Sequence, residues 1–88
     1  MKPLNYAILK YFTTVERACT TDVMKALKDQ YGHFKAFNDH DVLTAIMTAA
    51  QNGLLEESHF EMDAQNNLHV YFRAHEEGAQ TINRYIKD

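Results

Sequence analysis

The sequence predicts a small mixed α+β domain, mainly helical, with three helices, a β-hairpin and a closing helix in the order α-α-α-β-β-α. The spacing of apolar residues predicts this order: it is helical up to Gly53, alternates with polar residues from about 54 to 73, and becomes helical again near the C-terminus. The chain has 88 residues, close to the smallest size at which one core suffices for folding. We therefore expect a single domain over residues 1–88.

The first two helices are predicted by their start signals and apolar stripes. The first is expected from residue 3 to about residue 15, because Pro3 fits a helix start, where its missing N–H costs nothing. Its stripe is Leu4, Ile8, Tyr11, Phe12 and Val15. The second is expected to begin at Thr20 or Thr21 and to end at Gly32. Its inward residues are expected to be Val23, Ala26, Leu27 and Tyr31.

The third helix has the clearest boundaries. Asn38 is a strong N-cap, Asp41 stands at the third helical position, and Gly53 stops the helix. The expected inward stripe is Leu43, Ile46, Met47 and Ala50. In the short aromatic segment before this helix, residues 33–37, Phe34 and Phe37 are expected to fill the core.

A hairpin is expected over about residues 54–73, with a polar turn at residues 63–67. The expected register places apolar residues on one face and pairs opposite charges on the other. The apolar pairs are Met62 with Leu68, Phe60 with Val70, and Ser58 with Phe72. The polar pairs are Glu57 with Arg73, His59 with Tyr71, and Glu61 with His69.

The closing helix is expected over about residues 76–87. Gly78 is unfavourable inside a helix and is better accommodated in the first turn. The expected inward residues are Ala79, Ile82, Tyr85 and Ile86.

Charge is distributed unevenly along the chain. Residues 1–35 carry six basic and three acidic side chains, whereas residues 36–72 contain no lysine or arginine. The acidic residues of that second segment are Asp39, Asp41, Glu56, Glu57, Glu61 and Asp63. A single cysteine, Cys19, excludes an intrachain disulfide and is typical of a reducing compartment, so we expect a cytoplasmic protein. No segment resembles a signal peptide or approaches the roughly 20 apolar residues of a membrane span, so no membrane partner is expected.

Three segments resemble the winged-helix branch of the helix-turn-helix family. YAILKYF (6–12) is similar to the usual first helix, VLTAIMTAAQNGLLEE (42–57) to a third helix running into the wing, and AHEEGAQTINRYI (74–86) to the segment after the wing. The small bacterial and phage YjcQ-like proteins are similar in size and at both ends. The resemblance implies a winged helix-turn-helix fold with the hairpin as its wing.

The resemblance also implies a function. In this family the third helix enters the major groove of double-stranded DNA, and the wing touches the backbone or the minor groove. Carried over, the base-facing residues are Asp41, Thr44, Ala45, Thr48, Gln51 and Asn52, and the wing residues are 63–67. Phosphate contacts would come from Lys25, Lys28 and Lys35. The implied protein is a small transcriptional regulator that binds DNA as a homodimer.

Two further interpretations remain open beside DNA binding. An acidic third helix with small side chains could contact a basic protein partner, which predicts a protein-interaction module without DNA binding. A metal site would need His59, Glu61, His69 and His75 to converge on the hairpin, but their spacing matches no metal motif, so no metal or other cofactor is expected. No catalytic function is expected, because the sequence has no glycine-rich phosphate loop, HExxH motif or nucleophile elbow.

Overall fold

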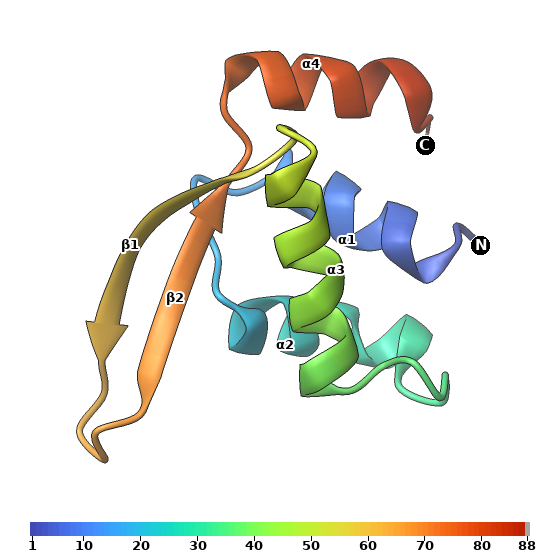
Figure 1. Ribbon diagram of the computed structural model, residues 1–88. Coiled ribbons are helices and arrows are strands. Elements are labelled where there is room, and N and C mark those ends of the chain that lie inside the picture. Colours follow the sequence, from blue (N-terminus) through green and yellow to red (C-terminus); the bar gives the residue numbers. More distant parts are fainter. Residues whose placement is uncertain (88) are drawn as a thin grey trace.

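The predicted order α-α-α-β-β-α is confirmed in a computed structural model of the protein (Figure 1). The structure describes residues 1–87, so residue 88 of the expected domain lies outside the described part. The elements are α1 (Leu4–Phe12), α2 (Thr20–Tyr31), α3 (Asp39–Gln51), β1 (Glu56–Met62), β2 (Leu68–Arg73) and α4 (Glu76–Tyr85). Within residues 1–87, no helix has the length and apolar character needed to cross a membrane.

The first three helices pack together, α4 lies across one end of them, and the hairpin projects from the same end along one side (Figure 1). The core is formed by residues from every helix and from the base of the hairpin. Its buried members include Ile8, Phe12, Val23, Val42, Ile46, Leu55, Phe72, Ile82 and Ile86. The hairpin base is tied to this bundle by a short antiparallel bridge, in which the backbones of Ala18 and Phe72 exchange two hydrogen bonds of 2.9 Å.

The first helix ends earlier than predicted. It stops at Phe12 and not near residue 15, because Thr13 and Thr14 turn the chain and their hydroxyls donate to the carbonyls three residues back. Of the two predicted starts of α2, Thr20 and Thr21, the structure has Thr20. Of its expected inward residues, Val23 and Tyr31 are buried and Leu27 is half-buried, but Ala26 is exposed. That expectation was therefore wrong for Ala26.

The start of α3 is as predicted, but its inward stripe is not. The side chain of Asn38 accepts a hydrogen bond of 2.9 Å from the backbone N–H of Asp41, which confirms the N-cap. The buried residues are Val42, Ile46 and Ala49, while Ala50 is half-buried. Leu43 and Met47 were expected inward and are 37% and 48% exposed. Because Val42, Ile46 and Ala49 face the core, residues one position further along turn toward the hairpin.

The hairpin register is confirmed for its outer part and wrong at its base. Met62 pairs with Leu68, Phe60 with Val70, Glu61 with His69, and His59 with Tyr71, as predicted. A bulge between Glu57 and His59 inserts one extra residue into β1 and shifts the remaining pairs. Consequently Arg73 lies opposite Glu56, with which it forms an ion pair of 3.3 Å, and Phe72 lies opposite Glu57.

The last helix begins at Glu76 and ends at Tyr85, two residues short of the predicted end. Ile82 and Ile86 are buried as expected, but Tyr85 is 75% exposed, so its inward assignment was wrong. Gly78 lies in the first turn, as predicted, and is buried. A Cβ at this position would lie 2.1 Å from the carbonyl oxygen of Leu54, so the close approach of α4 to the segment before β1 requires glycine.

The two aromatic residues before α3 are only half-buried. Phe37 packs against the core, whereas Phe34 makes edge-to-face contacts with Tyr31 and His33. The expectation that both fill the core therefore holds for Phe37, and Phe34 covers the aromatic cluster at the end of α2.

Candidate interface on the third helix and the hairpin

The residues predicted to face DNA bases lie on the outer side of α3 and on its flank toward α1. Thr44, Thr48 and Gln51 are exposed. A hollow of about 430 Å³ separates α3 from α1, and its apolar lining includes Ile8 and Leu9. Five of the six predicted residues line this hollow: Asp41, Thr44, Ala45, Thr48 and Asn52. These five residues therefore form one continuous surface with α1.

Two of these polar side chains already have partners within the helix. The hydroxyl of Thr44 donates to the carbonyl of His40 at 2.9 Å. The carboxylate of Asp41 accepts from the side-chain amide of Asn38 at 3.0 Å, next to the N-cap bond. Both groups therefore stabilise α3 itself. Hydrogen bonds from these groups to a DNA base would have to replace the bonds within the protein.

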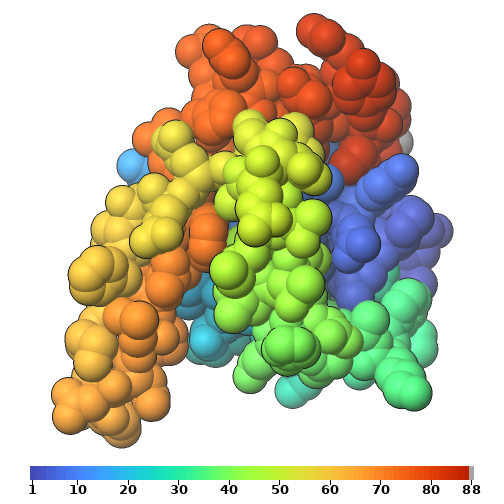
Figure 2. All heavy atoms as spheres, viewed as in Figure 1, coloured from blue at the N-terminus to red at the C-terminus, as the bar shows by residue number. Residues whose placement is uncertain are grey.

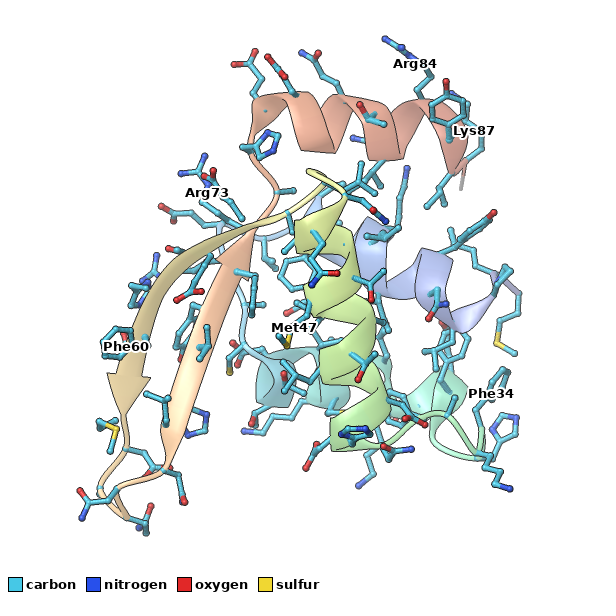
Figure 3. All side chains as sticks on the ribbon, viewed as in Figure 1. Phe34, Met47, Phe60, Arg73, Arg84 and Lys87 are labelled. Carbon is cyan, nitrogen blue, oxygen red and sulfur yellow. The ribbon has the colours of Figure 1, made fainter. Side chains whose placement is uncertain are left out.

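The opposite flank of α3 faces the hairpin and is apolar. Leu43 and Met47 lie there on successive turns, and across from them the apolar face of the hairpin carries Phe60, Met62 and Leu68, which are 57–64% exposed. Figure 3 shows Met47 on the hairpin side of α3 and Phe60 on β1. We call these five residues the apolar wing surface: Leu43, Met47, Phe60, Met62 and Leu68.

A furrow runs through this surface. It has a volume of about 250 Å³, and its apolar lining is Leu43, Leu68 and Val70. The rest of the lining comes from Cys19, Thr20 and Thr21 at the start of α2, from Asp39 of α3 and from His69 of β2. In Figure 2 the furrow is visible between the yellow and orange hairpin and the green α3. The furrow exists because the hairpin extends past the core toward its tip, where Phe60, Met62 and Leu68 are exposed and α3 makes few contacts with the strands.

The charges around the furrow are acidic on two of its three sides. Neither α3 nor the hairpin up to Phe72 contributes a lysine or arginine. Asp39 lines the furrow, and Glu57, opposite Phe72, lies on the same sheet face as the apolar side chains. Arg84 and Lys87 lie on and after α4, far from the hairpin tip (Figure 3).

The predicted phosphate-binding lysines are exposed. Lys25 and Lys28 belong to α2, and Lys35 lies in the segment between α2 and α3. Thr21 of α2 lines the furrow, and Lys25 and Lys28 follow it one and two turns later on the same side of that helix. Basic charge therefore borders the α2 side of the furrow, while the α3 and hairpin sides carry none.

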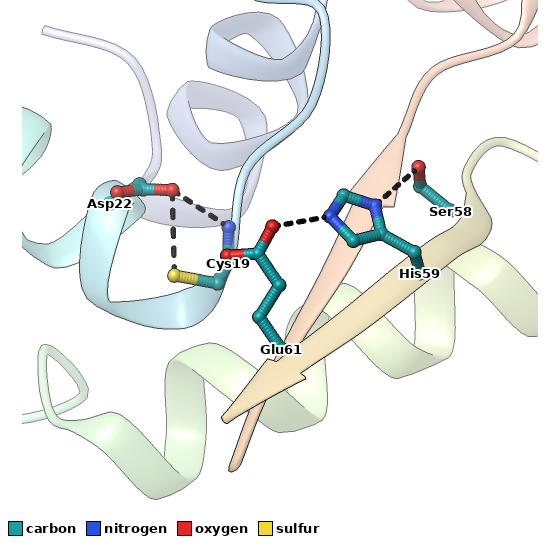
Figure 4. Close-up of polar contacts among 5 residues, drawn as sticks. All are labelled: Cys19, Asp22, Ser58, His59 and Glu61. Atoms are coloured by element: carbon teal, nitrogen blue, oxygen red, sulfur yellow. Dashed lines mark hydrogen bonds and ion pairs between the residues drawn. The ribbon is translucent and has the colours of Figure 1, made fainter. Parts of the chain in front are cut away.

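The other face of the hairpin carries a polar network (Figure 4). His59 bonds to Glu61 at 3.0 Å and to the hydroxyl of Ser58 at 3.1 Å, and its ring stacks on Tyr71 with centroids 4.8 Å apart. Hydrogen bonds at both ring nitrogens and stacking on one face therefore fix the orientation of the His59 ring.

The buried Cys19 lies at the start of α2, near this network. Its backbone N–H and its thiol both donate to the carboxylate of Asp22, at 3.1 and 3.4 Å, which caps the helix (Figure 4). The proximity of Cys19, followed by burial, raises the pKa of the Tyr71 phenol. The thiol is thus engaged with a carboxylate, and its role in the structure is that of a helix cap.

The histidines of the metal hypothesis each have a different partner. His69 bonds to Asp63 at 2.9 Å, and His59 bonds to Glu61. His75 caps α4 by accepting from the N–H of Gly78 and also contacts the carbonyl of Gly53 at 2.9 Å. Among the described residues, no three ligand-type side chains are grouped closely enough to hold a metal ion.

Sequence reasoning missed the apolar wing surface because it placed Leu43 and Met47 in the core. A signal was present: Val42, Ile46 and Ala49 form a second stripe with helical spacing on the same helix. Two stripes on one helix mean that one of them is on the surface or in an interface.

No family model matches the chain, and no curated protein is significantly similar to it in sequence.

Proposed function

We propose that this domain is a protein-interaction module that binds its partner through the apolar wing surface. One observation carries the proposal: five large apolar side chains are exposed together on the hairpin and the adjacent flank of α3. Small proteins rarely expose contiguous apolar surface of this kind unless it contacts a partner. Covering it would gain roughly 25 cal/mol for each Å² of apolar surface removed from water.

The chemistry of this surface suits protein better than DNA. A duplex presents phosphates, which are bound by lysine and arginine, and DNA-binding proteins typically make about 6–10 such contacts. From α3 to Phe72 of the hairpin, the two elements that would enter or flank the groove supply none of these side chains and carry six carboxylates, and Arg73 at the end of β2 is paired with Glu56. Leucine, methionine and phenylalanine are instead residues that fill the centre of protein interfaces.

A paired comparison of variants tests the proposal. Phe60→Ser and Met62→Ser remove exposed apolar groups from the hairpin tip, and Tyr85→Ser removes an even more exposed side chain from α4. We expect a partner that co-purifies with the wild-type protein and with Tyr85→Ser to be lost from the double variant Phe60→Ser, Met62→Ser. Equal recovery with all three proteins would show that the apolar wing surface is not the interface.

The second candidate function is binding of double-stranded DNA by a small winged-helix regulator, acting as a homodimer in the cytoplasm. It is favoured by the exposed Thr48 and Gln51 on the outer side of α3 and by the exposed Lys25 and Lys28 on α2. The order of elements supports membership of the winged-helix family. The free thiol of Cys19 suits a reducing compartment.

A salt titration tests the DNA candidate. Duplex binding measured from low to physiological salt should weaken as salt rises, and the slope should decrease when Lys25 and Lys28 are replaced by alanine. Absence of binding at low salt would exclude this candidate and leave the protein-interaction module as the proposal.

A further inference from the structure

We infer that the partner bound at the apolar wing surface is an amphipathic α-helix that combines aliphatic anchors with lysine or arginine. The inference rests on the proposed function and adds the shape and charge of the ligand. Three features of the surface lead to it: the geometry of the furrow, the exposed apolar side chains on both strands, and the sign of the charge on the α3 and hairpin sides.

The furrow suits a helix in shape. Its apolar lining comes from α3, with Leu43, and from β2, with Leu68 and Val70, while Thr20 and Thr21 at the start of α2 form its third side. Met47 extends the α3 wall by one turn, and Met62 and Phe60 extend the hairpin wall. An amphipathic helix presents apolar side chains one turn apart along a single stripe, which matches a trough with apolar side chains on both walls.

The alternative occupant of the furrow is an added β-strand. β2 is paired with β1 along one edge, but its other edge is bridged to Ala18 only at Phe72. The furrow is lined by Leu68, His69 and Val70, so it runs along this second edge as well as over the apolar face. A strand added at that edge would leave the exposed Phe60 and Met62 of β1 uncovered, whereas a helix laid on the apolar face can contact both strands.

The sign of the charge on the α3 and hairpin sides of the furrow favours a basic helix. Asp39 lies in the furrow lining and Glu57 on the same sheet face, and residues 36–72 contain no lysine or arginine. Lys25 and Lys28 border the α2 side alone. Opposite charges at the rim of an interface favour one partner and exclude others. A second copy docked symmetrically through this face would bring the same carboxylates together, so the charge disfavours self-association here.

Synthetic helical peptides provide a direct test with the intact protein. The first probe is a peptide of about 18 residues, long enough to be helical, with leucines at i, i+3, i+4 and i+7 and lysines elsewhere. The matched probe has glutamate in place of every lysine. Binding is measured by fluorescence anisotropy, and circular dichroism confirms that each protein variant is folded.

The expected result has three parts. The Leu/Lys peptide binds the wild-type protein at least about tenfold more tightly than the Leu/Glu peptide does. The double variant Leu43→Ser, Leu68→Ser weakens binding of the Leu/Lys peptide by about tenfold or more, since two aliphatic anchors are lost. The control variant Tyr85→Ser on α4 binds the Leu/Lys peptide as the wild type does.

Two results would overturn the inference, and they differ in what they say about the proposed function. If both peptides bind equally and both are weakened by the Leu43→Ser, Leu68→Ser variant, the apolar wing surface is an interface but its partner is not selected by basic charge. If neither peptide responds to that variant, a basic amphipathic helix is not the ligand. The proposed function is then decided separately by the loss or retention of the co-purifying partner in the hairpin-tip variants.

Discussion

The base and the tip of the hairpin carry the same apolar face but have opposite environments. At the base, Phe72 is 6% exposed, because its backbone is bridged to Ala18 and its ring joins the core. At the tip, on the same sheet face, Phe60 is 64% exposed. Alternation of apolar residues along a strand therefore marks a face and does not say what covers it. The base is covered by the domain itself, and the tip is available to a partner.

Replacing Phe72 and Phe60 one at a time should give the largest difference in the free energy of unfolding. Phe72→Ala removes a buried ring and should lower the free energy of unfolding by about 3–5 kcal/mol. Phe60→Ala should change it by no more than about 0.5 kcal/mol, since surface substitutions have little effect. Urea denaturation followed by circular dichroism measures both.

The milder Phe72→Leu keeps this comparison measurable if Phe72→Ala leaves the domain unfolded. Similar losses of stability for Phe72→Leu and Phe60→Leu would contradict the division into a structural base and an available tip. That outcome would mean that the tip packs against the domain in solution.

A second prediction concerns the packing behind the hairpin base. Gly78→Ala places a Cβ 2.1 Å from the carbonyl oxygen of Leu54, so α4 or the segment before β1 must move. We expect a loss of about 1–3 kcal/mol in the free energy of unfolding, as for other overpacked sites. Gln80→Ala, at an exposed position of the same helix, is the matched control and should be neutral or slightly stabilising. A neutral Gly78→Ala would show that α4 is docked loosely.

The order of elements was predictable because local signals agree with the fold. Asn38 followed by Asp41 specifies the start of α3, and the change from helical to alternating spacing after Gly53 specifies the hairpin. These signals depend on neighbours within a few residues, so the sequence alone expresses them. Most of the hairpin register followed for the same reason, since apolar and polar pairs had to match across the strands.

The errors arose where contacts between residues far apart in the sequence determine the structure. The rotation of α3 depends on which of two apolar stripes contacts the other helices, and no local signal separates Val42 from Leu43. The bulge after Glu57 lets Phe72 reach the core while Arg73 meets Glu56, a constraint set by the bridge to Ala18. The same errors affected the candidate site, because the spacing of apolar residues in the sequence assigns the residues of the apolar wing surface to a core.

The smallest expected effect lies at the hairpin tip, in the turn that holds Phe60 and Met62 at the surface. Asp63 accepts hydrogen bonds from His69 and from the backbone N–H groups of Asn67 and Gln65, at 2.9 Å each. The bond from His69 first, and the bond from the Asn67 backbone next, lower the pKa of Asp63 from 3.8 to about 2. A carboxyl with a lowered pKa stabilises the folded turn above its unfolded pKa and loses that contribution as the pH falls through the folded pKa.

The turn should therefore keep its geometry at neutral pH and loosen only between about pH 4 and pH 2, where the carboxyl of Asp63 takes up its proton. An NMR titration of the Asp63 carboxyl carbon should give a midpoint near 2 in the wild type and a higher one in His69→Ala, closer to 3.8. An unchanged midpoint in His69→Ala would assign the lowered pKa to the backbone N–H groups. The His69→Ala variant should leave the core signals of Phe72 as they are in the wild type, because the titrating group lies at the tip, beyond the bulge that separates the two parts of the hairpin.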